Sequence, residues 1–115
     1  MEKNCLFCKI IRNEIPAQKV FENDSMVIIK DISPQAPYHY LGIPKEHYPG
    51  IHDIPEGKTD ILEKLFSSIS EFVKKEGLVE KGYRLVVNSG EKAGQSVDHI
   101  HVHILSGRAM GWPPG

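Results

Sequence analysis

Hydrophobic residues recur with two different periods along the chain, and these periods predict its elements. Between residues 61 and 73, apolar side chains return every three or four positions, which is typical of a helix with one buried stripe, and Gly77 is placed to end it. A shorter helix is expected over residues 6–13, where Leu6, Ile10 and Ile11 have near-helical spacing. The pattern therefore predicts one long helix and one short helix.

Short apolar or alternating runs, bounded by turn residues, predict the strands. We expect strands over residues 19–22, 26–32, 39–44, 83–88 and 97–105. Because most of them are joined by tight turns, they should form an antiparallel sheet with the helices packed on one side. The predicted class is α+β with about five strands, and the length of 115 residues favours a single domain over residues 1–115.

Composition and charge narrow the classes of partner. Hydrophobic residues make up 40% of the chain and charged residues 25%, as in ordinary globular proteins. The net charge of −1 provides no general attraction to nucleic acid or to an anionic membrane, so we expect neither as a partner. No apolar run is long enough to span a bilayer, and the first residues are charged and polar. We therefore expect a cytoplasmic protein.

Three histidines near the C-terminal end alternate with aliphatic residues. On a strand, His99, His101 and His103 would share one face, with alternate Cα atoms roughly 6.5–7 Å apart. A neutral imidazole can attack phosphorus and form a covalent intermediate, and a second imidazole can donate a proton to the leaving group. The same spacing suits two ligands of a zinc ion. The row therefore predicts either a nucleophile with a helper or a metal site.

The loop over residues 88–96 directly precedes these histidines. It contains Gly90 and Gly94 among small polar residues, so its main-chain N–H groups, the Asn88 amide and the Ser96 hydroxyl could hold an anion. A polar loop with glycines is also a common hairpin connection. Its position beside the histidines favours phosphate binding.

Cys5 and Cys8 form a C-x-x-C pair and are the only cysteines in the sequence. This spacing is typical of half a zinc site, and its alternatives are a redox pair or two buried, reduced thiols. A redox role is disfavoured because no thioredoxin-like βαβ pattern accompanies the pair.

The segment from His99 to Leu105 matches the pattern His-φ-His-φ-His-φ-φ, where φ is apolar, at every position. The sequence also contains IIRNEIPAQKVFE, DISPQAP, IPKEH, GQSV before the histidines and a terminal WPPG. With these motifs the chain resembles the Hint branch of the histidine-triad (HIT) superfamily over essentially its whole length. His103 argues against the uridylyltransferase branch, which typically has Gln there, while the dinucleoside-polyphosphate hydrolase branch stays an alternative.

The resemblance implies a role for each matching position. His101 would be the nucleophile that becomes transiently nucleotidylated, His103 would contact the phosphate oxygens and help the leaving group, and His99 would orient the site. Other positions would bind the nucleotide: Asn88, Gly94, Gln95 and Ser96 at the phosphate and leaving group, Asp31 at the ribose, and Phe7, Ile29 and Ile32 at the purine.

The same resemblance implies an activity, an assembly and a metal. Members of this branch hydrolyse purine nucleoside phosphoramidates as homodimers, and the segment around Trp112 would reach the partner's active site. Zinc-bearing relatives imply a structural Zn²⁺ on Cys5, Cys8, His47 and His99, with no metal required for catalysis. A non-catalytic nucleotide-binding module and a zinc hydrolase with the triad as ligands stay as further alternatives.

Overall fold

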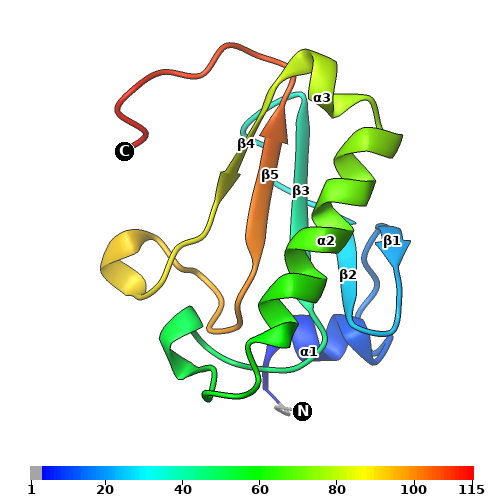
Figure 1. Ribbon diagram of the computed structural model, residues 1–115, viewed down its shortest axis with the longest axis vertical. Helices are drawn as coiled ribbons and strands as arrows, with labels where there is room; N and C mark the ends of the chain where they lie inside the picture. The colour runs from blue at the N-terminus through cyan, green and yellow to red at the C-terminus, as the bar shows by residue number, and fades with distance from the viewer. Residues whose placement is uncertain (1–3) are drawn as a thin grey trace.

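The antiparallel sheet expected from the alternating runs is present. The computed structural model describes residues 4–115. Its five strands pair in the order β1-β2-β3-β5-β4, which leaves β1 and β4 at the edges (Figure 1). The strands are β1 (Lys19–Glu22), β2 (Met26–Lys30), β3 (Tyr38–Pro44), β4 (Tyr83–Val86) and β5 (Val102–Ser106). The prediction of an α+β protein with a five-stranded antiparallel sheet is confirmed.

The two predicted helices lie on opposite faces of this sheet. The long helix α2 (Asp60–Lys75) crosses β2 and β3 and packs on a buried cluster that includes Ile28 (Figure 1). The short helix α1 (Leu6–Ile11) packs on a second buried cluster that includes Ile29. Because neighbouring residues of a strand point to opposite faces, these clusters are on the two sides of the sheet. The prediction that both helices pack on one side is wrong.

Three further short elements were not predicted: η1 (Ile51–Asp53), α3 (Leu78–Lys81) and η2 (Glu91–Ala93). Elements of three or four residues are too short for a periodic apolar pattern to reveal them. Gly77 has a left-handed φ of 71° and separates α2 from α3, so the predicted stop of the long helix is confirmed. Within residues 4–115, no helix has the length and apolar character needed to cross a membrane.

The last strand begins later than the pattern predicts. β5 starts at Val102, whereas the alternation predicted a strand from residue 97. The His99 N–H bonds the Val97 carbonyl at 2.8 Å, and the Ile100 N–H bonds the Tyr48 carbonyl at 2.9 Å. The main chain therefore turns and pairs with a loop before it joins the ladder. As a result, only His103 of the three histidines lies on a strand.

The pairing of β3 with β5 determines what surrounds His103. Leu41 is opposite His103 in the antiparallel register, and His39 is opposite Leu105. His39 and Leu41 share one face of β3 because they are two residues apart. His39 is thus brought to the same face of the sheet as His103, on the side covered by α1.

Candidate functional site

The three histidines of the triad lie close together and are largely buried. His99 has no exposed surface and His101 is 4% exposed, while His103 is half-buried. The ring centroids of His101 and His103 are 5.1 Å apart. Phe7 of α1 meets the ring of His101 edge-on, with centroids 4.9 Å apart. The triad therefore forms one group of rings beside α1.

The hydrogen bond of His101 leaves one of its nitrogens free as a nucleophile. His101 Nδ1 lies 2.7 Å from the main-chain oxygen of His99, and a carbonyl can only accept, so Nδ1 carries the proton. The neutral ring then has its lone pair on Nε2. Burial lowers the pKa of His101, which keeps the ring neutral around pH 7. His101 is therefore in the form that can attack an electrophile.

A fourth histidine, His39, fixes the proton of His103. The main-chain N–H of Gln35 donates to His39 Nδ1 at 3.0 Å, so the proton of a neutral His39 is on Nε2. His39 Nε2 lies 2.9 Å from His103 Nδ1 and donates to it. His103 consequently carries its own proton on Nε2. This chain of bonds leaves His103 as a hydrogen-bond donor through Nε2.

Sequence reasoning missed His39. The available signal was a histidine two residues from Leu41 on a predicted strand, with a Gln-Ala-Pro loop before it. That signal does not show which strand β3 pairs with or in which register, so the contact between His39 and His103 follows only from the fold.

Asp31 completes this polar group without converting it into a metal site. Its Oδ2 is 3.4 Å from His39 Nε2, and the ligand atoms of Asp31, His39 and His103 converge closely enough for an ion to be considered. However, His39 Nδ1 already accepts from Gln35, so its Nε2 holds a proton and has no lone pair for a metal. Burial lowers the pKa of His39 and of His103, while Asp31 opposes both shifts. The group is therefore a chain of neutral hydrogen-bonded rings.

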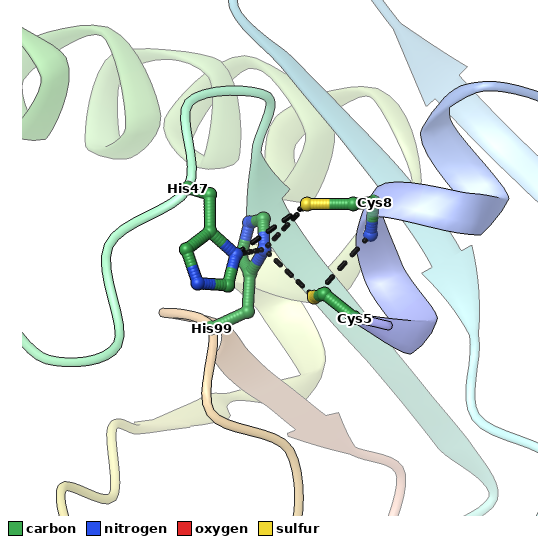
Figure 2. Close-up of side chains that lie close together, drawn as sticks. All are labelled: Cys5, Cys8, His47 and His99. Atoms are coloured by element: carbon green, nitrogen blue, oxygen red, sulfur yellow. Dashed lines mark hydrogen bonds between the residues drawn. The ribbon is translucent and has the colours of Figure 1, made fainter. Parts of the chain in front are cut away.

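Cys5, Cys8, His47 and His99 form a separate cluster with the donor set of a metal centre (Figure 2). His99 Nδ1 lies 3.3 Å from Cys5 Sγ, 3.6 Å from Cys8 Sγ and 3.0 Å from His47 Nδ1. His47 Nδ1 is 3.4 Å from Cys8 Sγ. All four ligand atoms lie within 4.8 Å of one another, which is close enough for one zinc ion with bonds of about 2.0–2.3 Å to nitrogen and sulfur.

The protonation of His99 suits metal binding. Its Nε2 lies 2.8 Å from the Pro44 carbonyl and donates to it, so the lone pair of the neutral ring is on Nδ1, toward the cysteines. Burial, reinforced by His47 and His101, lowers the pKa of His99 to about 4 despite the bond to Pro44. Both cysteines are in the reduced thiol form. The four residues therefore fit a tetrahedral S₂N₂ metal site.

The loop before the triad is held by one of its predicted binding residues. Gln95 is buried, accepts from the Gly90 N–H at 2.8 Å and donates to the Pro49 carbonyl at 2.7 Å. Its side chain thus supports the loop, and its main-chain N–H also bonds within the loop, to the Gly90 carbonyl at 3.1 Å. Gly94 has a left-handed φ of 93°, and a Cβ there would lie 3.8 Å from Asn88 Nδ2.

Asn88 and Ser96 lie at the two ends of this loop. Asn88 follows Val86, the residue opposite His103 in the β4–β5 pairing, by two positions, and is half-buried. An extended chain would therefore place Asn88 on the His103 face. Ser96 is exposed and lines a surface hollow together with Cys5 and His47.

Only part of the predicted apolar slot is packed in this structure. Phe7 and Ile29 belong to the buried cluster beneath α1. Ile32 is 97% exposed, because the chain leaves the ladder after Lys30 and turns, so it does not pack with the other two residues here. Asp31 follows β2 directly and lies between Ile29 and Ile32 in the sequence.

Comparisons with known proteins agree with this geometry. Residues 4–112 match the family described as the scavenger mRNA decapping enzyme C-terminal binding family. The "Adenylylsulfatase HINT1" of Arabidopsis thaliana is 46% identical over 112 residues, covering 96% of this chain and 76% of that protein. The "14 kDa zinc-binding protein" of Brassica juncea is 45% identical over 112 residues, covering 96% of this chain and 98% of that protein.

Solved structures give the same result. A HIT family hydrolase from Legionella pneumophila has 48% identity and a TM-score of 0.93, covering 97% of this chain and 100% of that one. Hydrolase activity in general is what these relatives support for the chain. The matching family, the relatives and the shared fold show that the chain belongs to the Hint branch of the histidine-triad superfamily.

Proposed function

We propose that the protein is a nucleotide-binding hydrolase that cleaves the P–N bond of purine nucleoside phosphoramidates through a nucleotidyl-histidine intermediate. The observation that carries this proposal is the hydrogen bond from His101 Nδ1 to the His99 carbonyl at 2.7 Å, which leaves a neutral Nε2 for attack. The adjacent His103 presents an N–H group, as a charged phosphoryl group requires.

The reaction has two steps. His101 Nε2 attacks the α-phosphorus, and the new N–P bond replaces the P–N bond of the substrate. The electron pair of the broken bond goes to the amine nitrogen, which takes up a proton from solvent and leaves as a neutral amine. Water then attacks the nucleotidyl-histidine, which restores His101 and releases the nucleoside monophosphate and a proton. Over both steps one water is consumed, and its proton ends on the amine while its hydroxyl ends on phosphorus. His99 stabilises the cationic intermediate through its carbonyl.

His103 acts as a donor to the phosphoryl oxygens throughout. Loss of a single well-placed donor of this kind costs about 10²–10³-fold in rate in other enzymes. Because His39 holds His103 in its neutral form, His103 stabilises the developing charge without giving up its proton.

The remaining predicted residues would bind the nucleotide. The Asp31 carboxylate would accept from the ribose hydroxyls, and Phe7, Ile29 and the exposed Ile32 would form the purine slot once a base covers them. The loop would contribute the Asn88 amide and the Ser96 hydroxyl near the leaving group. Gly94 and Gln95 would shape the loop around the phosphate, since their N–H groups bond the Glu91 and Gly90 carbonyls at 3.0 and 3.1 Å.

We further propose that the Cys/His cluster holds a structural Zn²⁺. Bound there, zinc supplies a cross-link between α1, the loop after β3 and the segment before β5. The S₂N₂ donor set supports this role because closed four-ligand sites are the structural kind. The protein would work as a homodimer in the cytoplasm, with the exposed Trp112 segment at the partner's site.

Adenylyl sulfate is a second candidate substrate. A leaving group that departs as a stable anion needs no proton, which suits a site whose His103 is held neutral. The name of the Arabidopsis relative points to the same chemistry. The attack by His101 on the α-phosphorus would be unchanged.

Release of AMP from adenosine 5′-phosphoramidate tests the proposal, together with mass spectrometry of the quenched enzyme. We expect turnover and an AMP adduct on His101, and we expect neither with His101→Ala. Turnover without an adduct would reject the covalent mechanism. Activity only on diadenosine polyphosphate, or only on adenylyl sulfate, would reject phosphoramidates as the substrate class. AMP binding without any turnover would reject hydrolysis and indicate a non-catalytic nucleotide-binding module.

A further inference from the structure

We infer that the Cys/His cluster sets the orientation and the tautomer of His101, acting through the main chain of His99 and through Phe7. Cys5, Cys8 and His47 are positioning residues in this role, because they act through His99 and Phe7 and do not contact the reacting atoms. The inference rests on the proposed function only in taking His101 as the nucleophile.

His99 links the cluster directly to His101. Its ring is fixed at both nitrogens, with Nδ1 facing Cys5 and His47 and with Nε2 bonded to Pro44. Its carbonyl oxygen is the acceptor for His101 Nδ1. Holding the ring of His99 therefore also holds the acceptor that selects the tautomer of His101.

The sheet does not provide this support. β5 begins at Val102, so the carbonyl of His99 lies outside the ladder. The neighbouring Ile100 N–H is instead bonded to the Tyr48 carbonyl, and Tyr48 follows the cluster residue His47 directly. Both the side chain of His99 and the main chain next to it are thus joined to the same loop after β3. The side chains of the Cys/His cluster add a second link between the His99 segment and this loop.

A second route runs through α1. Cys5 is the N-cap of this helix and Cys8 is in its first turn, and between them Phe7 meets the rings of His99 and His101 edge-on, at 5.8 and 4.9 Å between centroids. A helix of six residues is far too short to be stable without tertiary contacts. Freeing both cysteines would loosen α1 and would let Phe7 move away from His101.

The test reads the tautomer of His101 directly. Protein with ¹⁵N-labelled histidine is compared by long-range ¹⁵N–¹H NMR in the zinc-loaded form, in the chelator-treated form and as Cys5→Ser. We expect a single Nδ1–H tautomer for His101 with zinc and a mixture of tautomers without it. AMP affinity by calorimetry should fall about 10-fold, in line with the cost of small misplacements in active sites.

Three further variants keep the test decisive. Cys5→His retains a metal ligand at this position, so the zinc-bound variant should show the single His101 tautomer. His47→Gln removes a ligand from a half-buried loop residue and gives a second metal-deficient protein. Ile10→Val weakens the packing of the same helix without touching the cluster and should leave the tautomer unchanged. A folded, metal-free protein that keeps one His101 tautomer and unchanged AMP affinity would overturn the inference.

The outcome is separable from that of the proposed function. If the tautomer depends on zinc but wild-type protein forms no AMP adduct on His101, the positioning stands and the hydrolytic proposal fails. If the adduct forms equally fast and the tautomer is the same with and without zinc, the positioning fails and the hydrolytic proposal stands.

Discussion

The role of His39 gives a sharp prediction, because two substitutions there separate hydrogen bonding from simple packing. Leu fills the buried site but neither accepts from Gln35 nor donates to His103. A glutamine introduced at position 39 also loses the bond from the Gln35 N–H, because it has no acceptor in place of Nδ1. Its amide nitrogen takes the place of Nε2, however, and can still donate to His103. The two variants therefore differ in the one bond that sets the proton of His103.

The expected magnitudes follow from counting these bonds. A neutral hydrogen bond contributes about 1 kcal/mol, so His39→Leu should lower the free energy of unfolding by about 2 kcal/mol and His39→Gln by about 1 kcal/mol. Loss of the imposed tautomer, at about 1 kcal/mol, slows the first chemical step about 5-fold. If the ring of His103 also turns away, the loss rises toward that of a whole phosphoryl donor, about 100-fold.

The assay is a single-turnover measurement of AMP–histidine formation by rapid quench, combined with urea denaturation of each variant. We expect His39→Leu to be between about 5-fold and 100-fold slower than wild type, and His39→Gln to stay within about 5-fold of it. A folded His39→Leu protein that forms the adduct at the wild-type rate would refute the argument. Equal slowing by Leu and by Gln would refute it as well.

The other predictions concern pH dependence, backbone conformation and assembly. Burial lowers the pKa of His101, so kcat/KM should stay level below the ordinary histidine pKa of about 6.5, whereas a normal acid limb at that pH would contradict this. The unfolded chain then binds protons that the folded one does not, so the free energy of unfolding should decline as pH falls below about 6.5 in thermal or urea titrations. Gly107→Ala should cost about 2–4 kcal/mol in denaturation, because φ is 98° and the Cβ would lie 2.9 Å from neighbouring atoms, while Gly57→Ala, with φ 85° and open space, should cost only about 1–2 kcal/mol. Sedimentation should give twice the chain mass of 12.9 kDa. Trp112 is 83% exposed in the single chain, so Trp112→Ala should weaken the dimer. A monomer at all concentrations would exclude the proposed assembly.

The periodic pattern of apolar residues predicted the elements whose boundaries are set by nearby residues. The bounds of β1 agree with the expected range, and α2 ends before Gly77 as the pattern indicates. The alternation in the triad predicted that the histidines share one face, and the intervening Ile100 and Val102 are buried in the cluster beneath α2. In each case the information lies within a few residues of the element concerned.

The errors and omissions arise where distant segments meet. The start of β5 was misplaced because Ile100 bonds Tyr48, a partner that no local pattern indicates. The opposite placement of α1 and the contact of His39 with His103 depend on strand order and register in the same way. The C-x-x-C spacing indicated two ligands, whereas His47 and His99 came from the family resemblance. They are brought to the cysteines only by the fold, since His47 is 39 positions from Cys8 and His99 is 94 positions from Cys5 along the chain.

The distances along the chain between contacting residues have a consequence for biosynthesis. Cys5 and His99 are 94 positions apart, and His39 and His103 are 64 apart. At roughly 5–20 residues per second, the ribosome needs about 5–19 s between making the first cysteine and making its histidine partner. During that interval the β1–β2–β3 meander can form, because its contacts are close in sequence. The Cys/His cluster still lacks His99, and the group of Asp31 and His39 still lacks His103. In a nascent chain the two cysteines therefore lack their His99 partner, and the triad is not assembled, until the final strand is inserted between β3 and β4. That insertion completes both groups of side chains at once.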